Sequence, residues 1–234
     1  RWTAEGVIFH GREVDWAPGS QMFELQTHPY LPSMASFTSG GFYVQDPSTL
    51  LAVETLDPQP GETVLDACAA PGGKATYIAQ RMSNNGRIVA HDPEAARLDL
   101  LRENCERLGV TVVESTTELP GEAPVFDRVL VDAPCSNTGV LRRRVESRWR
   151  LIPEELGRLA DRQLAILSDA SRRLKPGGRL VYSTCSLETV ENRGVVDRFL
   201  AAVSGFQLEA DRSLHPAADS VDGAYVARLI RLPG

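Results

Sequence analysis

Cysteine and histidine are scarce in this sequence, with four of each among 234 residues. There is no CxxC pair and no HExxH-like cluster, which excludes a disulfide scaffold and argues against a structural zinc site. The chain also lacks a run of about 18 apolar residues and the apolar segment of a signal peptide. We therefore expect a cytoplasmic protein that binds no metal and enters no membrane.

An excess of positive charge is also missing. The net charge is −6, so binding to a nucleic acid would need a local basic patch. A hydrophobic content of 42% is enough for a proper core, and the length predicts one domain with an appendage. Because the chain begins with Arg1 rather than methionine, we interpret the sequence as part of a longer protein.

Residues 1–45 hold eight of the fifteen aromatic side chains. The first six recur every seven residues, but Pro18, Pro29 and Pro32 would break a helix long enough to use that spacing. We therefore expect an irregular or short-stranded segment at 1–45 and a separate domain at 46–234. The eight aromatic residues are Trp2, Phe9, Trp16, Phe23, Tyr30, Phe37, Phe42 and Tyr43.

From about residue 62, short apolar runs alternate with helical patterns. This alternation predicts a doubly wound, Rossmann-like α/β sheet of mostly parallel strands. The last two strands are expected as an antiparallel pair at the sheet edge. The predicted strands are 63–70, 86–92, 110–115, 126–134, 179–186, 206–211 and 224–232, and the predicted helices are 74–82, 93–109, 153–174 and 188–202.

A glycine-rich loop, DACAAPGGKAT at 66–76, follows the first predicted strand. Gly72 and Gly73 permit a tight turn, and the next helix offers free N–H groups to a ligand. Asp92 closes the second strand, where a carboxylate can bind ribose hydroxyls or cap the following helix. The loop matches neither GxGxxG nor GxxxxGK(S/T), which favours a nucleoside without phosphates, such as S-adenosylmethionine, over a dinucleotide.

Two cysteines lie at the ends of neighbouring predicted strands. Cys135 stands in DAPCSNTG after the fourth strand, and Cys185 stands in YSTCS at the end of the fifth. Adjacent parallel strands open at the same edge, so both thiols are expected to face one crevice beside the cofactor. Burial as small core residues is the alternative. We adopt it for Cys105, whereas Cys68 is expected to shape the cofactor loop.

These stretches resemble the Sun/Fmu-type RNA (cytosine-5) methyltransferases. The resemblance rests on DACAAPGGKAT, VDAPCSNTGVLRR, LKPGGRLVYSTCSLETVEN and DGAYVARL, and covers about 190 residues from GGFYVQDPSTL onward. It implies a class I methyltransferase fold that methylates carbon-5 of a cytidine in RNA. It also implies that Cys185 attacks carbon-6 and that Cys135 assists its release.

The resemblance extends to further site residues. Asp132 is expected to hydrogen-bond the cytosine or, alternatively, to contact the cofactor. Lys74 is expected to orient the base or lower the pKa of the thiol, and a solvated lysine is the alternative. The expected contacts of S-adenosylmethionine are Cys68, Ala69, Ala70, Pro71, Gly72, Gly73, Lys74, Asp92, Arg97, Ser115, Asp132 and Pro134.

Two positions depart from the family pattern. Ser115 stands where an aspartate usually contacts adenine, and Glu114, Glu118 or backbone groups are the possible substitutes. Asn137 replaces a glycine of the PCSGTG version, which we interpret as tolerated variation.

RNA contact is expected directly after the Cys135 loop. The stretch LRRRVESRWR at 141–150 carries five arginines and could hold phosphates, although a solvated charged loop is the alternative. Trp149 is expected to stack on a base or to pack on the core. Residues 1–45 could extend the RNA surface or form a small core of their own. The expected RNA-binding residues are Arg142, Arg143, Arg144, Arg148 and Trp149.

Two functions from different classes follow. The first is a monomeric, S-adenosylmethionine-dependent RNA methyltransferase, with rRNA favoured over tRNA by the resemblance. The second is a non-catalytic RNA-binding or ribosome-assembly factor, which Ser115 motivates. A Rossmann dehydrogenase is disfavoured because the glycine spacing is wrong.

Overall fold

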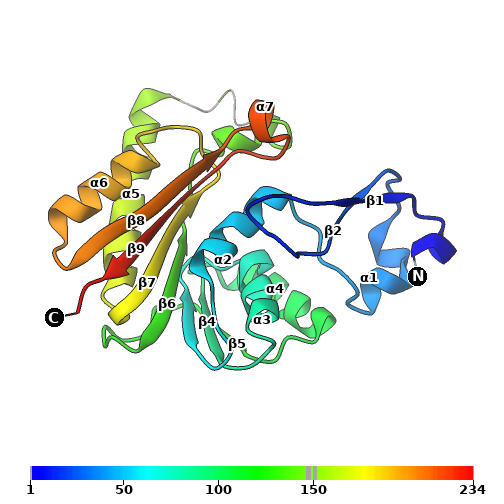
Figure 1. The fold of residues 1–234 in the computed structure, drawn as a ribbon, viewed down its shortest axis with the longest axis horizontal. Helices are drawn as coiled ribbons and strands as arrows, with labels where there is room; N and C mark the ends of the chain where they lie inside the picture. Colours follow the sequence, from blue (N-terminus) through cyan, green and yellow to red (C-terminus); the bar gives the residue numbers. More distant parts are fainter. Residues whose placement is uncertain (1, 146–148, 150–151, 234) are drawn as a thin grey trace.

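The computed structural model describes residues 2–145, 149 and 152–233, and a seven-stranded sheet forms its centre (Figure 1). The strands are β3 (Thr63–Asp66), β4 (Arg87–His91), β5 (Val113–Thr116), β6 (Phe126–Asp132), β7 (Leu174–Thr184), β8 (Phe206–Leu214) and β9 (Ala224–Arg231). They lie in the order β5-β4-β3-β6-β7-β9-β8. The first five pair in parallel, which confirms the predicted doubly wound α/β sheet.

The closing strands form the predicted pair at the sheet edge. β9 runs antiparallel to β7 on one side and to β8 on the other. The reversed strand therefore lies one place inside the edge, and β8 is the outermost strand.

Helices cover both faces of the sheet, because neighbouring strand residues point to opposite sides. Val64 packs in the cluster with α2 and α3, whereas Leu65 packs in the cluster with α5 and α6, and Ile88 and Val89 divide in the same way. α4 packs on the side of α2 and α3, against Ala90. The helices are α2 (Leu50–Leu56), α3 (Gly73–Arg81), α4 (Ala95–Leu108), α5 (Pro153–Ser171) and α6 (Arg193–Ala202). No described helix is long and apolar enough to span a membrane.

Several element boundaries differ from the prediction. α5 ends at Ser171 rather than residue 174, and β7 begins at Leu174, so KPGG lies inside the strand. The reason is that Leu174 pairs with Phe126, and a register shift between Phe126 and Arg128 accommodates the additional residues of β7. β5 and α6 also begin later than predicted, at Val113 and Arg193.

The N-terminal segment has the short-stranded structure that the prolines predicted. β1 (Phe9–Arg12) and β2 (Met22–Leu25) form a hairpin, followed by the short helix α1 (Ala35–Thr38), and both extend beyond α2–α4 in Figure 1. The Trp2 ring packs edge-on against Phe9, Phe23 and Phe42, with centroids 5.0 to 5.2 Å apart. These aromatic residues therefore form a small cluster, although no helix brings them together.

The segment is also joined to the main core. The buried Trp16 packs with residues of α2 and α3, and its Nε1 donates to the backbone oxygen of Pro47. Arg107 on α4 lies over the Phe37 ring at 4.0 Å and donates to the backbone oxygens of Phe37 and Phe42. A domain boundary at 45/46 stays a prediction.

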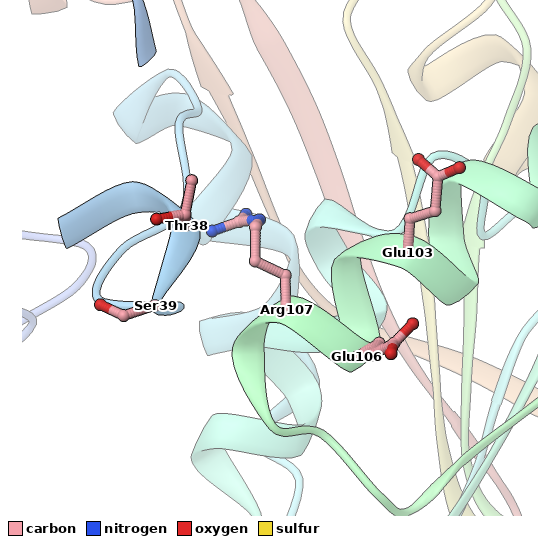
Figure 2. A pocket seen from close by; sticks show the side chains of 5 residues that line it. All are labelled: Thr38, Ser39, Glu103, Glu106 and Arg107. Atoms are coloured by element: carbon pink, nitrogen blue, oxygen red, sulfur yellow. The ribbon is translucent and has the colours of Figure 1, made fainter. Parts of the chain in front are cut away.

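An open hollow of about 440 Å³ lies beside this contact. Figure 2 shows the Arg107 guanidinium reaching from α4 toward Thr38, while Glu103 and Glu106 point away from it. None of the residues expected at the active site lines this hollow. It marks where the N-terminal segment packs on the domain, not the reaction centre.

A four-residue ion cluster ties the chain together at the Cys135 loop. Arg142 and Arg143 each bridge Asp46, directly before the short helix η3 (Pro47–Thr49), and Asp222, two residues before β9. Both carboxylates are buried, and the Asp222 N–H donates to Asp46 Oδ1. Burial alone would raise the pKa of Asp46, but the N–H groups of Asp222 and Ser48 and the Arg143 guanidinium lower it to about 2.

We expect Asp46→Asn to lower the free energy of unfolding by about 2 kcal/mol at pH 7. The folded-state pKa lies below the unfolded one, so this contribution is complete above about pH 4 and is lost as the pH falls toward about 2. Urea unfolding at pH 7, 5, 4 and 3 measures it. Glu24→Gln, in an exposed ion pair with Arg12, is the control. An Asp46→Asn deficit of equal size at pH 3 and pH 7 would contradict the prediction.

Candidate active site

β6 and β7 bring two thiols to one place. Asp132 at the end of β6 pairs with Ser183 on β7. Cys135 follows Asp132 by three residues, and Cys185 follows Ser183 by two. The Sγ atoms of Cys135 and Cys185 lie 3.3 Å apart, and both are free thiols. The thiols therefore meet as the strand order predicted. Cys105 is buried on α4, as expected of a core residue.

The thiol pair is polarised. The hydrogen bond from Cys135 lowers the pKa of Cys185 against the opposing effect of burial, and the charge of Lys74 lowers it further. The same hydrogen bond, together with burial, raises the pKa of Cys135 well above its usual value. Cys185 is therefore the thiol that ionises more easily, and Cys135 retains its proton.

Asn137 contacts both cysteine residues. Its φ of 62° is in the left-handed region, which glycine and asparagine adopt at least cost, so asparagine can replace the glycine of the resembling family. Its Nδ2 donates to the backbone oxygen of Cys135, and its Oδ1 lies 3.1 Å from Cys185 Sγ. Because Oδ1 only accepts, Asn137 favours the protonated Cys185, in competition with Cys135.

Lys74 and Asp132 form an ion pair beside the thiols. Lys74 Nζ lies 2.6 Å from Asp132 Oδ2, and Ser183 Oγ donates to Asp132 Oδ1 at 2.7 Å. Burial would lower the pKa of Lys74, but the charge of Asp132 outweighs it and raises the pKa, so the ammonium stays charged. The alternative of a solvated lysine is wrong, because only 17% of the Lys74 side chain is exposed to solvent.

The predicted cofactor loop lies between β3 and α3. The Ala69 N–H donates to His91 O, which fixes the loop against β4. Gly72 adopts φ 108°, and a Cβ there would lie 3.1 Å from the Leu101 side chain, so the turn requires glycine. The residues from Cys68 to Gly72 thus connect the end of β3 to the N-terminus of α3, which begins at Gly73. Pro134 lies after β6, where its backbone oxygen accepts from Gln163.

Asp92 directly follows β4 and is almost fully buried. Its Oδ1 accepts from the Glu94 N–H, which precedes α4, so it stabilises the turn before the helix and does not cap the helix itself, as the alternative to ribose binding had it. Its Oδ2 pairs with Arg97 at 2.8 Å, and Arg97 also donates to Ala70 O. Three of the predicted cofactor residues are thereby brought together, and ribose binding by Asp92 stays a prediction.

Asp66 is a site residue that the sequence interpretation missed. It ends β3, it is fully buried, and neither carboxylate oxygen has a hydrogen-bond partner among the described residues. Burial, followed by the charge of Asp132, raises its pKa to about 7. A ligand with an ammonium group would satisfy this carboxyl, and S-adenosylmethionine carries one, so these residues fit that cofactor. The signal was the acidic residue that opens DACAAPGGK.

Ser115 lies on β5 beside Ala90 of β4, and its hydroxyl accepts from Arg102 at 2.8 Å. Glu114, one possible substitute for the usual aspartate, is held by two hydrogen bonds from Arg87. The backbone N–H of Glu118 donates to the Thr116 hydroxyl. These contacts lie within the protein, and adenine binding by Ser115, Glu114 or Glu118 stays a prediction.

The arginine-rich stretch is only partly free to meet RNA. Arg142 and Arg143 have the ion-pair role described above, which the sequence did not reveal. Arg144 contributes to the lowered pKa of Cys185. Trp149 is 87% exposed, so the alternative of packing on the core is wrong. Arg148 lies outside the described residues.

Close backbone contacts join the loop after Cys135 to Cys185 and to the residue before the start of β9. The Gly139 N–H donates to Cys185 O, and the Gly223 N–H donates to Gly139 O. A Cβ on Gly139 would lie 2.7 Å from Cys185 O, so only glycine permits this approach. Among the described residues, no group of three or more histidine, cysteine or acidic side chains could hold a metal ion.

The sequence is similar to those of known RNA methyltransferases. A family model described as 16S rRNA methyltransferase RsmB/F matches residues 53–230. The probable ribosomal RNA small subunit methyltransferase B of Bacillus subtilis (strain 168) is 42% identical over 184 residues, which cover 76% of this chain and 41% of that protein. The ribosomal RNA small subunit methyltransferase B of Vibrio cholerae serotype O1 is 38% identical over 216 residues, 88% of this chain and 50% of that protein. The chain thus spans half or less of these two relatives.

A solved structure gives the same fold. NSun6 from Pyrococcus horikoshii with SFG is 29% identical and superposes with a TM-score of 0.80. The match covers 93% of this chain and 62% of that one. The class I methyltransferase fold that the sequence resemblance implied is therefore confirmed.

We expect iodoacetamide to alkylate Cys185 before Cys135, because the thiolate is the reactive form. Cys135→Ala removes the hydrogen bond that lowers the pKa of Cys185 and should shift its alkylation profile to higher pH. Asn137→Gly removes the competing acceptor and should shift the profile to lower pH. Peptide mass spectrometry across pH 6 to about 10 measures both shifts. Preferential alkylation of Cys135 would contradict the polarity.

Proposed function

The chain belongs to the 16S rRNA methyltransferase RsmB/F family, and we propose that it methylates carbon-5 of a cytidine in RNA. The observation that carries the proposal is the free thiol pair, with the sulfurs of Cys135 and Cys185 3.3 Å apart after two neighbouring parallel strands. Ribosomal RNA is favoured over tRNA, because both curated relatives bear the name of small-subunit rRNA enzymes.

The first step is addition of the Cys185 thiolate to carbon-6 of cytosine. Carbon-5 of the free base is a poor nucleophile, and the new C6–S bond moves electron density onto it. Asp132 accepts a hydrogen bond from the cytosine amine, and its Oδ2 pairs with the Lys74 ammonium. Carbon-5 then takes the methyl group, whose bond to the donor sulfur breaks.

The second step is release of the thiol, and the order in which the thiols ionise explains it. The pKa of Cys135 is raised chiefly by its hydrogen bond to Cys185, by burial and by the charge of Cys185. In the adduct the sulfur of Cys185 is a neutral thioether, so its charge no longer raises the pKa of Cys135. Burial and the charge of Glu191 remain, and Cys135 ionises more easily than before. Cys135 then takes the carbon-5 proton, the C5=C6 bond re-forms, and Cys185 leaves as thiolate.

S-adenosylmethionine supplies an electrophilic methyl group on a sulfonium. The loop from Cys68 to Gly73 would hold it against the N-terminus of α3, and the orphaned Asp66 carboxyl would accept its ammonium group. Asp92 would bind the ribose hydroxyls, with Arg97 holding that carboxylate in place.

The target cytidine must be unpaired or extruded to reach the thiols. The exposed Trp149 would stack on a base, and Arg144 would contact phosphate. A cytoplasmic location belongs to the proposal, because all four cysteines are free thiols. A monomeric state stays an expectation.

A second candidate is an RNA-binding or ribosome-assembly factor that has kept the fold without the activity. The serine at position 115, where the family has an aspartate, favours it. The retained thiol pair and Lys74 argue against it. Binding of S-adenosylmethionine discriminates, because a non-catalytic factor has no need of a methyl donor.

We expect Cys185→Ala to reduce 5-methylcytidine formation on RNA by more than about 10³-fold, because the nucleophile is lost. Cys135→Ala should instead accumulate a covalent protein–RNA adduct, visible as a retarded band on a denaturing gel. Cys105→Ala, which changes a core cysteine on α4, is the matched control and should retain turnover. Adduct accumulation in Cys185→Ala instead would reverse the two roles.

For the cofactor, we expect Asp92→Ala to weaken binding of S-adenosylmethionine by about tenfold or more, because a charge-assisted hydrogen bond is worth about 1.5–3 kcal/mol. Ser115→Ala should change the affinity by less than about twofold, since its hydroxyl is engaged by Arg102. Isothermal titration calorimetry measures both. Absence of binding to the unaltered protein at millimolar cofactor would favour the second candidate.

A further inference from the structure

One buried carboxylate connects the two cysteine loops. Glu191 lies between β7 and α6, and its side chain is completely buried. Its backbone oxygen accepts from the Tyr182 hydroxyl at 2.5 Å, which fixes the residue to β7. Glu191 touches neither sulfur within hydrogen-bond distance. Its charge raises the pKa of Cys135 through space, and any effect on the position of the thiols acts through other residues.

The carboxylate accepts four hydrogen bonds from neutral donors. Oε1 accepts from the Ser136 N–H and from Gln163 Nε2, both at 2.9 Å. Oε2 accepts from the Ser186 hydroxyl at 2.6 Å and from the Ser136 hydroxyl. A buried carboxylate with this many donors is fully satisfied and holds each of them in place.

Two of the residues that donate to Glu191 are the serines next to the cysteines. Ser136 directly follows Cys135, and Ser186 directly follows Cys185. Their hydroxyl oxygens lie 3.2 Å apart, beside sulfurs that lie 3.3 Å apart. The gap between the two loops is therefore bridged at the residue next to each thiol.

We propose that Glu191 is a positioning residue that sets the separation of the Cys135 and Cys185 sulfurs by holding the serine after each cysteine. The inference rests on the proposed function for what the thiols do, but not for the distance between them. Gln163 belongs to the same assembly, because its Nε2 also donates to Pro134 O, directly before Cys135.

Two substitutions of Glu191 separate this role from a general need for a filled core. Glu191→Gln can keep the bridge. Its amide oxygen can face the two N–H donors, and its amide nitrogen can donate to the serine hydroxyls, which rotate to accept. Glu191→Ala removes the bridge and leaves the serines unrestrained.

The separation of the sulfurs can be measured without RNA or methyl donor. Diamide oxidises two adjacent thiols to a disulfide and takes up their two protons and two electrons, becoming the hydrazine. Peptide mass spectrometry then quantifies the Cys135–Cys185 crosslink over time. We expect Glu191→Ala to crosslink about tenfold more slowly than the unaltered protein, because small displacements of reacting atoms cost up to about 100-fold in rate. Glu191→Gln should stay within about twofold of it.

A milder pair of variants guards against loss of the fold. Ser186→Ala removes one link of the bridge and should also slow crosslinking. Ser171→Ala removes an equally buried hydroxyl on α5, which donates to Ser168 O, and should not. Thermal unfolding of each variant confirms that the comparison is made between folded proteins.

Rapid crosslinking in folded Glu191→Ala and Ser186→Ala would overturn the inference. Crosslinking as slow in Glu191→Gln as in Glu191→Ala would also overturn it, since charge rather than the bridge would then be responsible. A protein that crosslinks as expected but forms no 5-methylcytidine would contradict the proposed function alone.

Discussion

Parallel pairing of β6 with β7 is the constraint from which the site follows. It sets Asp132 opposite Ser183. Because the two strands are parallel, the loops that follow these residues leave the same edge of the sheet side by side. The backbone contact between Gly139 and Cys185 and the Glu191 bridge complete what the pairing begins. Two thiols far apart in the sequence become chemically one unit for this reason.

The same proximity makes the two cysteines unequal. Two thiols in hydrogen-bond contact cannot both ionise, so the proton remains on one of them. Lys74 and Asn137 have opposite effects on the ionisation of Cys185. The Lys74 ammonium favours the thiolate, and the Asn137 amide oxygen favours the protonated thiol. The charge of Asp132 raises the pKa of both Asp66 and Lys74, because charges interact strongly at low dielectric.

Several charged residues near the site have a structural role. The Arg142 and Arg143 guanidiniums look like an RNA patch in the sequence, but in the fold they join Asp46 and Asp222 from distant parts of the chain. The Cys135 loop is thereby fixed at its far end, as Glu191 fixes it at its near end. The N-terminal segment contributes through Trp16, whose Nε1 donates to the backbone oxygen of Pro47, the residue after Asp46.

The amino-acid sequence alone determined the element types, the doubly wound sheet and the meeting of Cys135 with Cys185, because these follow from local periodicity and from strand neighbours along the chain. The prediction that β7 begins at residue 179 was wrong. Leu174 pairs with Phe126, so the strand includes KPGG although these residues favour a turn. Only the tertiary structure revealed the orphaned Asp66, the ion cluster and the Glu191 bridge. These depend on which polar groups burial brings together from distant segments, and no pattern within a single segment records that.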